Sequence, residues 1–90
     1  MIKVLFFANI RDITNEKETE VSGPSTVKEL LVLLSGRYGD VFRNEAFDGD
    51  TLSDRIIVLV NGKHIAHTGG ASTPVTDGDT VAVFPIIGGG

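Results

Sequence analysis

Three consecutive glycines, Gly88, Gly89 and Gly90, follow a strongly β-forming run at residues 80–87. Glycine adds no side chain to a core and loses the most backbone entropy when it is ordered, so these residues would stabilise a fold very little. They do provide a thin, flexible thread that ends in a free carboxylate and can enter a channel too narrow for any residue with a Cβ. We therefore expect the α-carboxylate of Gly90 to be the reactive group and Gly89 to thread the channel. The glycines alone leave an inert tail as the alternative.

The other residues that could do chemistry form no recognisable reactive site. The chain has no cysteine, which excludes disulfides, thiol nucleophiles and thiolate metal sites. His64 and His67 lie three positions apart without an acidic cluster nearby, so we expect surface histidines and no metal. Gly69 and Gly70 precede Ala-Ser-Thr-Pro, whereas a phosphate-binding loop has Gly-Lys followed by Ser or Thr. We expect no bound cofactor.

Length and charge narrow the class of protein. Ninety residues predict one domain with a modest core. The net charge of -4 argues against nucleic acid as a partner, because phosphate binding needs a basic surface. The apolar run at residues 56–60 is far too short to cross a membrane, and no signal peptide precedes the first strand pattern. A cytoplasmic location is the expectation.

The first half of the chain predicts a hairpin and a helix. Residues 1–8 and 18–22 alternate as strands, antiparallel to each other, with a loop or wide hairpin at residues 9–16. Thr26 and Glu29 form a capping box at the start of a helix. That helix carries one apolar stripe, formed by Val27, Leu30, Leu31, Leu34 and Tyr38, and can end at Gly36 or Gly39.

The second half is less regular at its start. Residues 40–54 predict an irregular segment with a turn at residues 48–50 and with Val41, Phe42 and Phe47 as anchors. Residues 56–60 form a continuous apolar strand, which predicts a central place in the sheet.

Three further features complete the pattern. Asn61-Gly62 is a tight turn before a short return strand at residues 63–66, and a polar loop follows at residues 67–74. The final strand spans residues 80–86. Pairing should weaken at Pro85, which has no N–H to donate, so the tail should leave the sheet at about residue 86.

The order of these elements fits an α+β fold of the β-grasp type, in which a mixed sheet holds one main helix on one face. Such a sheet would place its first and last strands side by side and parallel. We expect residues 1–87 to form the β-grasp domain and residues 88–90 to form a flexible reactive tail.

Strand alternation assigns the two faces of this sheet. The helix should cover the side chains of Val4, Phe6, Val58, Val60, Val81 and Val83. The opposite face should carry Leu5, Phe7, Leu59, Ala82 and Phe84. An exposed apolar face on a small protein usually marks a partner-binding surface, and Pro85 and Gly88 would extend that surface toward the tail. The alternatives are a second layer formed by residues 40–54, or self-association.

The last strand and tail, residues 77–90, resemble the C-terminal signature of the molybdopterin synthase small subunit (MoaD) and of ubiquitin-like sulfur carriers such as ThiS. In that family a D-G-D-x-V segment leads into F-P-P-[apolar]-x-G-G. The opening Lys-Val-Leu-Phe-Phe-Ala with Arg11-Asp12, the helix start at Thr26-Val27, and Val-Asn-Gly at residues 60–62 also match the family. Two positions depart from the pattern, because Ile86 replaces its second proline and Gly88 replaces a larger residue.

The resemblance implies a mechanism and a set of partners. A ubiquitin-activating-like adenylyltransferase would use ATP to adenylate the Gly90 carboxylate, and a sulfur donor would convert it to a thiocarboxylate. The large subunit of molybdopterin synthase would then receive the tail, so this chain would be a carrier subunit with no independent active site. The resemblance also implies alternatives: a carrier for thiamin or amino-acid biosynthesis, or a ubiquitin-like modifier that forms isopeptide bonds. A plain β-grasp interaction module with an inert tail stays open as well.

Overall fold

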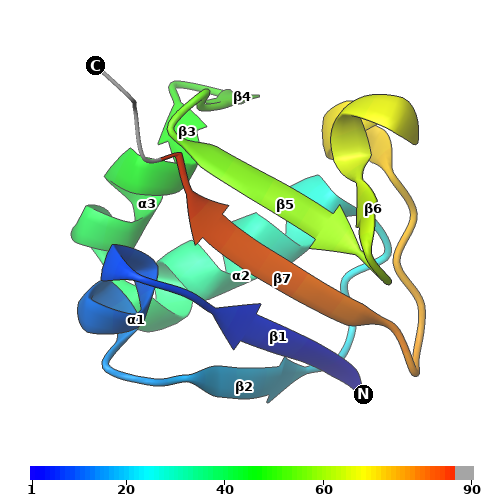
Figure 1. The fold of residues 1–90 in the computed structure, drawn as a ribbon, viewed down its shortest axis with the longest axis horizontal. Helices are drawn as coiled ribbons and strands as arrows, with labels where there is room; N and C mark the ends of the chain where they lie inside the picture. Colours follow the sequence, from blue (N-terminus) through cyan, green and yellow to red (C-terminus); the bar gives the residue numbers. More distant parts are fainter. Residues whose placement is uncertain (87–90) are drawn as a thin grey trace.

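A computed structural model of the chain describes residues 1–86 and shows a five-stranded mixed sheet crossed on one face by a long helix (Figure 1). The strands run in the order β2-β1-β7-β5-β6. Their bounds are β1 (Ile2–Phe6), β2 (Glu18–Val21), β5 (Ile56–Val60), β6 (Lys63–His64) and β7 (Thr80–Pro85). The crossing helix is α2 (Val27–Tyr38). This is the predicted arrangement of sheet and helix.

β7 lies in the middle of the sheet, between the β1–β2 pair and the β5–β6 pair. β1 pairs antiparallel with β2 and parallel with β7, where Val4 lies opposite Val81. β5 pairs antiparallel with β7, where Val58 lies opposite Val83. The predicted parallel contact between the first and last strands is confirmed. Residues 56–60 form an interior strand, as predicted, because β5 pairs with β7 on one side and with the short edge strand β6 on the other. The middle place in the sheet belongs to β7.

The predicted capping box begins α2. The Thr26 hydroxyl accepts a hydrogen bond from the backbone N–H of Glu29 at 3.2 Å. The Glu29 carboxylate reaches back one residue further than expected, to the backbone N–H of Ser25 at 2.9 Å. Capping groups of this kind satisfy amides that a helix start leaves without partners. The predicted stripe is buried except for its last residue, Tyr38, which is partly exposed.

A short helix, α1 (Asn9–Thr14), replaces the loop predicted at residues 9–16. Ile10 is fully buried, and Ile13 packs against the core, so burial of these two side chains holds the helix. No side chain caps its start, and it ends at Asn15 in a left-handed conformation with φ 59°. Six residues are too few for a clear helical period, which explains why the sequence pattern did not indicate a helix.

Residues 40–54 contain more regular structure than predicted. Helix α3 (Asp40–Ala46) is followed by a hairpin of β3 (Phe47–Asp48) and β4 (Thr51–Leu52), so the predicted turn at residues 48–50 is confirmed. Phe42 is buried and lies edge-on to Phe6 with ring centroids 6.3 Å apart. Val41 is not an anchor, because it is 64% exposed.

The segment after the Asn61-Gly62 turn is also shorter as a strand than predicted. β6 ends at His64, and the chain continues through two 3-10 turns, η1 (Ile65–His67) and η2 (Gly70–Ser72). Asn61 and Gly62 have φ values of 51° and 84°, as a tight hairpin turn requires. No helix in the described part of the chain is long and apolar enough to span a bilayer.

Candidate docking face and tail exit

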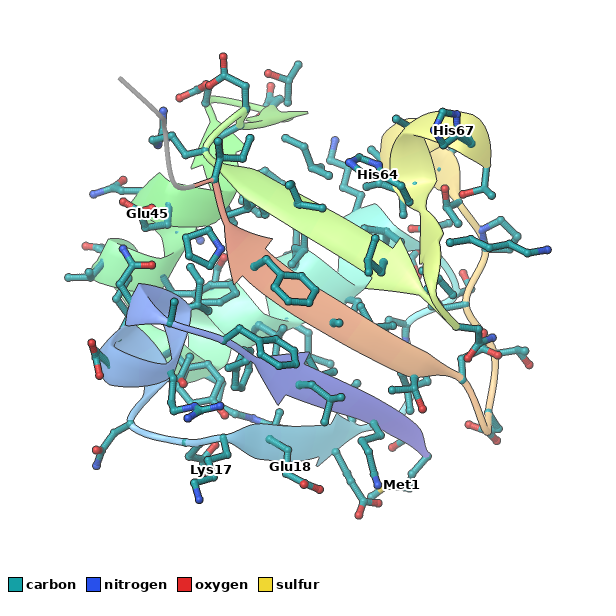
Figure 2. The ribbon with its side chains drawn as sticks, viewed as in Figure 1. Met1, Lys17, Glu18, Glu45, His64 and His67 are labelled. Atoms are coloured by element: carbon teal, nitrogen blue, oxygen red, sulfur yellow. The ribbon has the colours of Figure 1, made fainter. Side chains whose placement is uncertain are left out.

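The sheet face turned away from α2 is open and apolar. Figure 2 shows aromatic rings lying over β1 and β7 on this face, which no helix crosses. Its partly exposed members are the five that alternation predicted, Leu5, Phe7, Leu59, Ala82 and Phe84. We call these five residues, together with Ile57, the open face.

Register brings the members of the open face together. Leu5 lies opposite Ala82 on the parallel β1–β7 pair, and Ala82 lies opposite Leu59 on the antiparallel β5–β7 pair. The rings of Phe7 and Phe84 are stacked, with centroids 4.3 Å apart and planes 9° from parallel. The result is a continuous apolar surface three strands wide.

Ile57 belongs to this surface but was not predicted. It is partly exposed and lies directly opposite Phe84. A continuous apolar run conceals alternation because both of its faces look hydrophobic. Counting two residues back from Leu59 would have placed Ile57 on the same face.

The alternative in which residues 40–54 cover the open face is wrong. α3 packs against α2, on the other side of the sheet, and Phe42 contacts the buried side of Phe6. No element of the described residues forms a second layer over the open face (Figure 1).

The end of β7 determines where the tail begins. Pro85 is partly exposed and lies opposite Ile56. Weaker pairing was predicted at Pro85, but pairing with β5 continues one residue further, because the N–H of Ile86 donates to the carbonyl of Arg55 at 2.9 Å. β7 itself ends at Pro85, close to the predicted exit at about residue 86. Backbone N–H groups alternate in direction along a strand, so the nitrogen of Pro85 points toward the β1 side. β1 has already ended at Phe6, so the missing N–H of Pro85 costs the sheet no hydrogen bond. Gly88, Gly89 and Gly90, the predicted tail residues, lie outside the described residues.

The two histidines do not form a recognisable metal site. His64 ends β6, and its Nδ1 accepts a hydrogen bond from the backbone N–H of Ala66 at 3.0 Å. The rings of His64 and His67 are 6.0 Å apart. Within residues 1–86, no group of three or more potential metal-binding side chains comes together.

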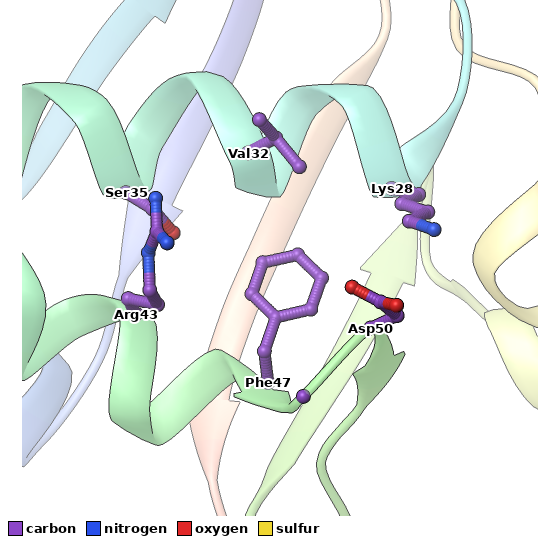
Figure 3. A pocket seen from close by; sticks show the side chains of 7 residues that line it. Lys28, Val32, Ser35, Arg43, Phe47 and Asp50 are labelled. Carbon is purple, nitrogen blue, oxygen red and sulfur yellow. The ribbon is translucent and has the colours of Figure 1, made fainter.

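A small hollow of about 190 Å³ lies on the helix side of the molecule, between α2 and the β3–β4 hairpin. Figure 3 shows the ring of Phe47, one of the lining residues, below Val32 and between Arg43 and Asp50. Its lining mixes cationic, anionic and apolar side chains, without a nucleophile–base pair. Sequence reasoning did not predict this hollow, since it forms only where α3 turns the chain back along α2.

The comparisons with known proteins agree with this architecture. The model of the ThiS family matches residues 4–90. The chain is 36% identical to the molybdopterin synthase sulfur carrier subunit of Escherichia coli over 90 residues, covering 100% of both chains. It is 32% identical to small archaeal modifier protein 3 of Haloferax volcanii, covering 99% of this chain and 98% of that protein.

Solved structures show the same fold. The crystal structure of the Amycolatopsis orientalis BexX/CysO complex contains a similar chain, with a TM-score of 0.86, 28% identity and 100% coverage of both chains. The solution structure of small archaeal modifier protein 1 from Methanosarcina acetivorans has a TM-score of 0.85 and 30% identity, covering 99% of this chain and 95% of that one. The chain therefore belongs to the ThiS family of ubiquitin-like sulfur carriers and has their β-grasp fold.

Proposed function

We propose that this protein carries sulfur as a thiocarboxylate on Gly90 and serves as the small subunit of molybdopterin synthase. The observation that carries the proposal is the 36% identity with a molybdopterin synthase sulfur carrier subunit over the whole of both chains. The family match also extends through the glycines to residue 90. The position of the open face beside the end of β7 supports the same role, because a partner bound there would lie next to the start of the tail.

The proposed chemistry takes place in two steps on a partner enzyme. A carboxylate oxygen of Gly90 attacks the α-phosphate of ATP, which forms an acyl-adenylate and releases pyrophosphate. Hydrosulfide supplied by a sulfur donor then attacks the acyl carbon, the bond from that carbon to the AMP oxygen breaks, and AMP and a proton leave, which gives the thiocarboxylate. This chain supplies the carboxylate and the docking surface, and ATP is bound by the activating enzyme. The lack of cysteine leaves no thiol in the chain to capture the activated acyl group.

The open face would contribute by positioning. Docking of an apolar surface supplies binding energy away from the reacting atoms, and that energy can hold a carboxylate where it reacts. Phe84 lies on the strand that leads into the tail, so a partner that binds Phe84 and Phe7 would hold the tail at a fixed reach from the docked surface.

A second candidate is a ubiquitin-like modifier that forms isopeptide bonds with target lysines. The similarity to two small archaeal modifier proteins favours it. Both functions require adenylation of the tail, but only the modifier produces covalent conjugates. High-mass conjugates in cell extracts, absent after deletion of Gly89 and Gly90, would support the modifier over the synthase subunit.

Intact-mass spectrometry tests the proposal directly. The protein is incubated with an adenylyltransferase of this family, ATP and a sulfur donor. We expect one oxygen to be exchanged for sulfur and the change to map to the C-terminal peptide. Sulfur on another residue, or no incorporation with an enzyme that activates a known carrier, would contradict the proposal.

The variant Gly89→Val tests the role of the tail. We expect it to fold normally, because the hydrophobic core is built from residues between Ile2 and Val83. A β-branched side chain cannot enter a channel shaped for glycine, so adenylation should fall to background. The measurement is pyrophosphate release beside a thermal melt, with Thr76→Val as a β-branched control outside the tail. Normal adenylation of Gly89→Val would show that the channel does not require glycine.

A further inference from the structure

The C-terminal end of α3 is held by the segment that leads into β5. A helix leaves its last carbonyls without intrahelical partners. Here the carbonyls of Asn44, Glu45 and Ala46 accept hydrogen bonds from only two residues, Ser53 and Arg55. Ser53 donates to Glu45 through its hydroxyl and to Ala46 through its backbone N–H, at 2.8 Å in the second case. Arg55 donates to Asn44 through its guanidinium.

The Arg55 side chain has further contacts. Its guanidinium lies 3.2 Å from the carbonyl of Phe47 and forms an ion pair with Asp48 at 2.9 Å. The backbone N–H of Arg55 donates to the Ser53 hydroxyl at 3.2 Å. The contacts of the side chain with Asn44, Phe47 and Asp48 are all made by one guanidinium nitrogen, Nη2. Arg55 is therefore fixed by α3, by β3 and by Ser53.

The main chain of Arg55 connects this cluster to the tail. Its carbonyl accepts the hydrogen bond from the N–H of Ile86, the last residue that the structure describes. That bond extends the β5–β7 ladder by one residue beyond Pro85. A proline at position 86 could not make the bond, because proline has no N–H. The same residue thus holds the end of α3 with its side chain and the start of the tail with its carbonyl.

We propose that Arg55 is a positioning residue, which fixes the point and direction at which the tail leaves the sheet. This inference rests on the proposed function, since it concerns delivery of the Gly90 carboxylate to an activating enzyme. The Arg55 side chain contacts α3 and β3, whereas its backbone carbonyl contacts Ile86, so the side chain would act on the tail through its own backbone. Small displacements of a reacting group can lower a rate by about 100-fold, which makes the start of a short tail important.

Amide hydrogen exchange tests the structural part without any partner. In Arg55→Ala we expect the Ile86 amide to exchange about tenfold faster, because its acceptor is no longer held. The Phe84 amide, inside the ladder, should change by less than about twofold. Arg37→Ala is the matched control, since Arg37 also donates to a backbone carbonyl, that of Glu20 at 3.3 Å, but far from the tail. Equal exchange of Ile86 in wild type and Arg55→Ala would overturn the proposal.

Steady-state adenylation by an activating enzyme of this family tests the functional part. For Arg55→Ala we expect kcat to fall about tenfold with KM within about twofold of wild type, because docking through the open face is intact. A merely destabilised protein would melt earlier but, once folded at the assay temperature, would keep its kcat. Wild-type kcat in folded Arg55→Ala would overturn the positioning role. If wild type itself is not adenylated, the proposed function fails and the positioning role fails with it.

A rescue experiment makes the inference specific to the start of the tail. Ile86→Pro removes the N–H that donates to the Arg55 carbonyl but fixes φ at position 86 covalently, so in the Arg55→Ala background it should hold the start of the tail without that hydrogen bond. We expect the double variant to recover kcat to within about threefold of wild type. Ile86→Val in the same background keeps the N–H and adds no restriction, so it should not recover. Absence of recovery by proline, or equal recovery by valine, would show that the loss arises elsewhere in the protein.

Discussion

The two faces of the sheet are almost equally apolar in sequence but have different surroundings. On β7, Val81 and Val83 are fully buried under α2, whereas their neighbours Ala82 and Phe84 remain partly exposed. Apolar composition therefore does not decide burial; the position of the single long helix does. The difference supports the proposed docking role of the open face, since a monomer gains little from exposing hydrophobic residues.

Phe6 and Phe7 show this contrast at adjacent positions. Phe6 has no exposed surface and meets the rings of Tyr38 and Phe42 edge-on, at 5.6 and 6.3 Å. Phe7 lies on the other face and stacks flat on Phe84. A ring surrounded by core contributes mainly to folding, whereas a stacked pair on an open surface is available to a partner.

The largest expected effect is on folding, from the buried face. Phe6→Ala should lower the free energy of unfolding by about 3–5 kcal/mol, because it removes a fully buried ring and leaves a cavity. The matched control is Phe7→Ala, the same change one residue away on the open face. Urea denaturation measures both. A similar loss of stability in the two variants would remove the distinction between the faces.

Substitutions on the open face should affect partner binding more than folding stability. Phe84→Ala and Phe7→Ala should each weaken binding to a partner by about 30-fold, which corresponds to about 2 kcal/mol. Their loss of folding stability should be smaller than that of Phe6→Ala. Partner titration by calorimetry beside thermal melts measures this, with Val32→Ala as a control, because Val32 is 50% exposed on α2. Lower melting temperatures with unchanged affinity would assign these rings to the core.

The smallest expected effect concerns the cap of the helix that covers the buried face. Hydrogen bonds from the Ser25 backbone N–H and hydroxyl lower the pKa of Glu29 below its ordinary value of 4.5. A carboxyl group whose pKa is lower in the folded state stabilises the fold above its unfolded pKa, and this contribution is lost as pH falls through the folded pKa. Glu29→Gln should therefore be less stable than wild type at pH 7, with the difference shrinking below pH 4.5.

Urea midpoints at pH 7 and at about pH 3 measure this difference. Glu45→Gln is the control, because the Glu45 carboxylate forms no hydrogen bond or ion pair in the described part of the chain. A difference between wild type and Glu29→Gln that is independent of pH would show that the charge of Glu29 does not act through the cap.

The sequence predicted the sheet, α2 and the open face because each depends on local information. Period-two alternation distinguished Leu5 from Val4, and the capping box located the start of α2 at Thr26. α1 was missed because its six residues are held by tertiary burial of Ile10, which no local pattern reveals.

The Arg55 cluster could not be predicted for a different reason. Its acceptors are carbonyls eight and eleven residues earlier in the chain, and every residue has a carbonyl. An arginine in a turn before a strand therefore reads as an ordinary surface charge. Only the packing of α3 beside the start of β5 brings the guanidinium to these carbonyls.

The central place of β7 has a consequence for how the protein folds. β1 and β5 do not pair with each other. Each of them pairs with β7, at residues 80–85, on the side toward the middle of the sheet. Contacts between β1 and β7 close a loop of nearly the whole domain, and such long-range pairing slows folding. A growing or truncated chain that lacks β7 would present two unpaired strand edges and no continuous sheet. We therefore expect the domain to form late and cooperatively, with no stable N-terminal fragment.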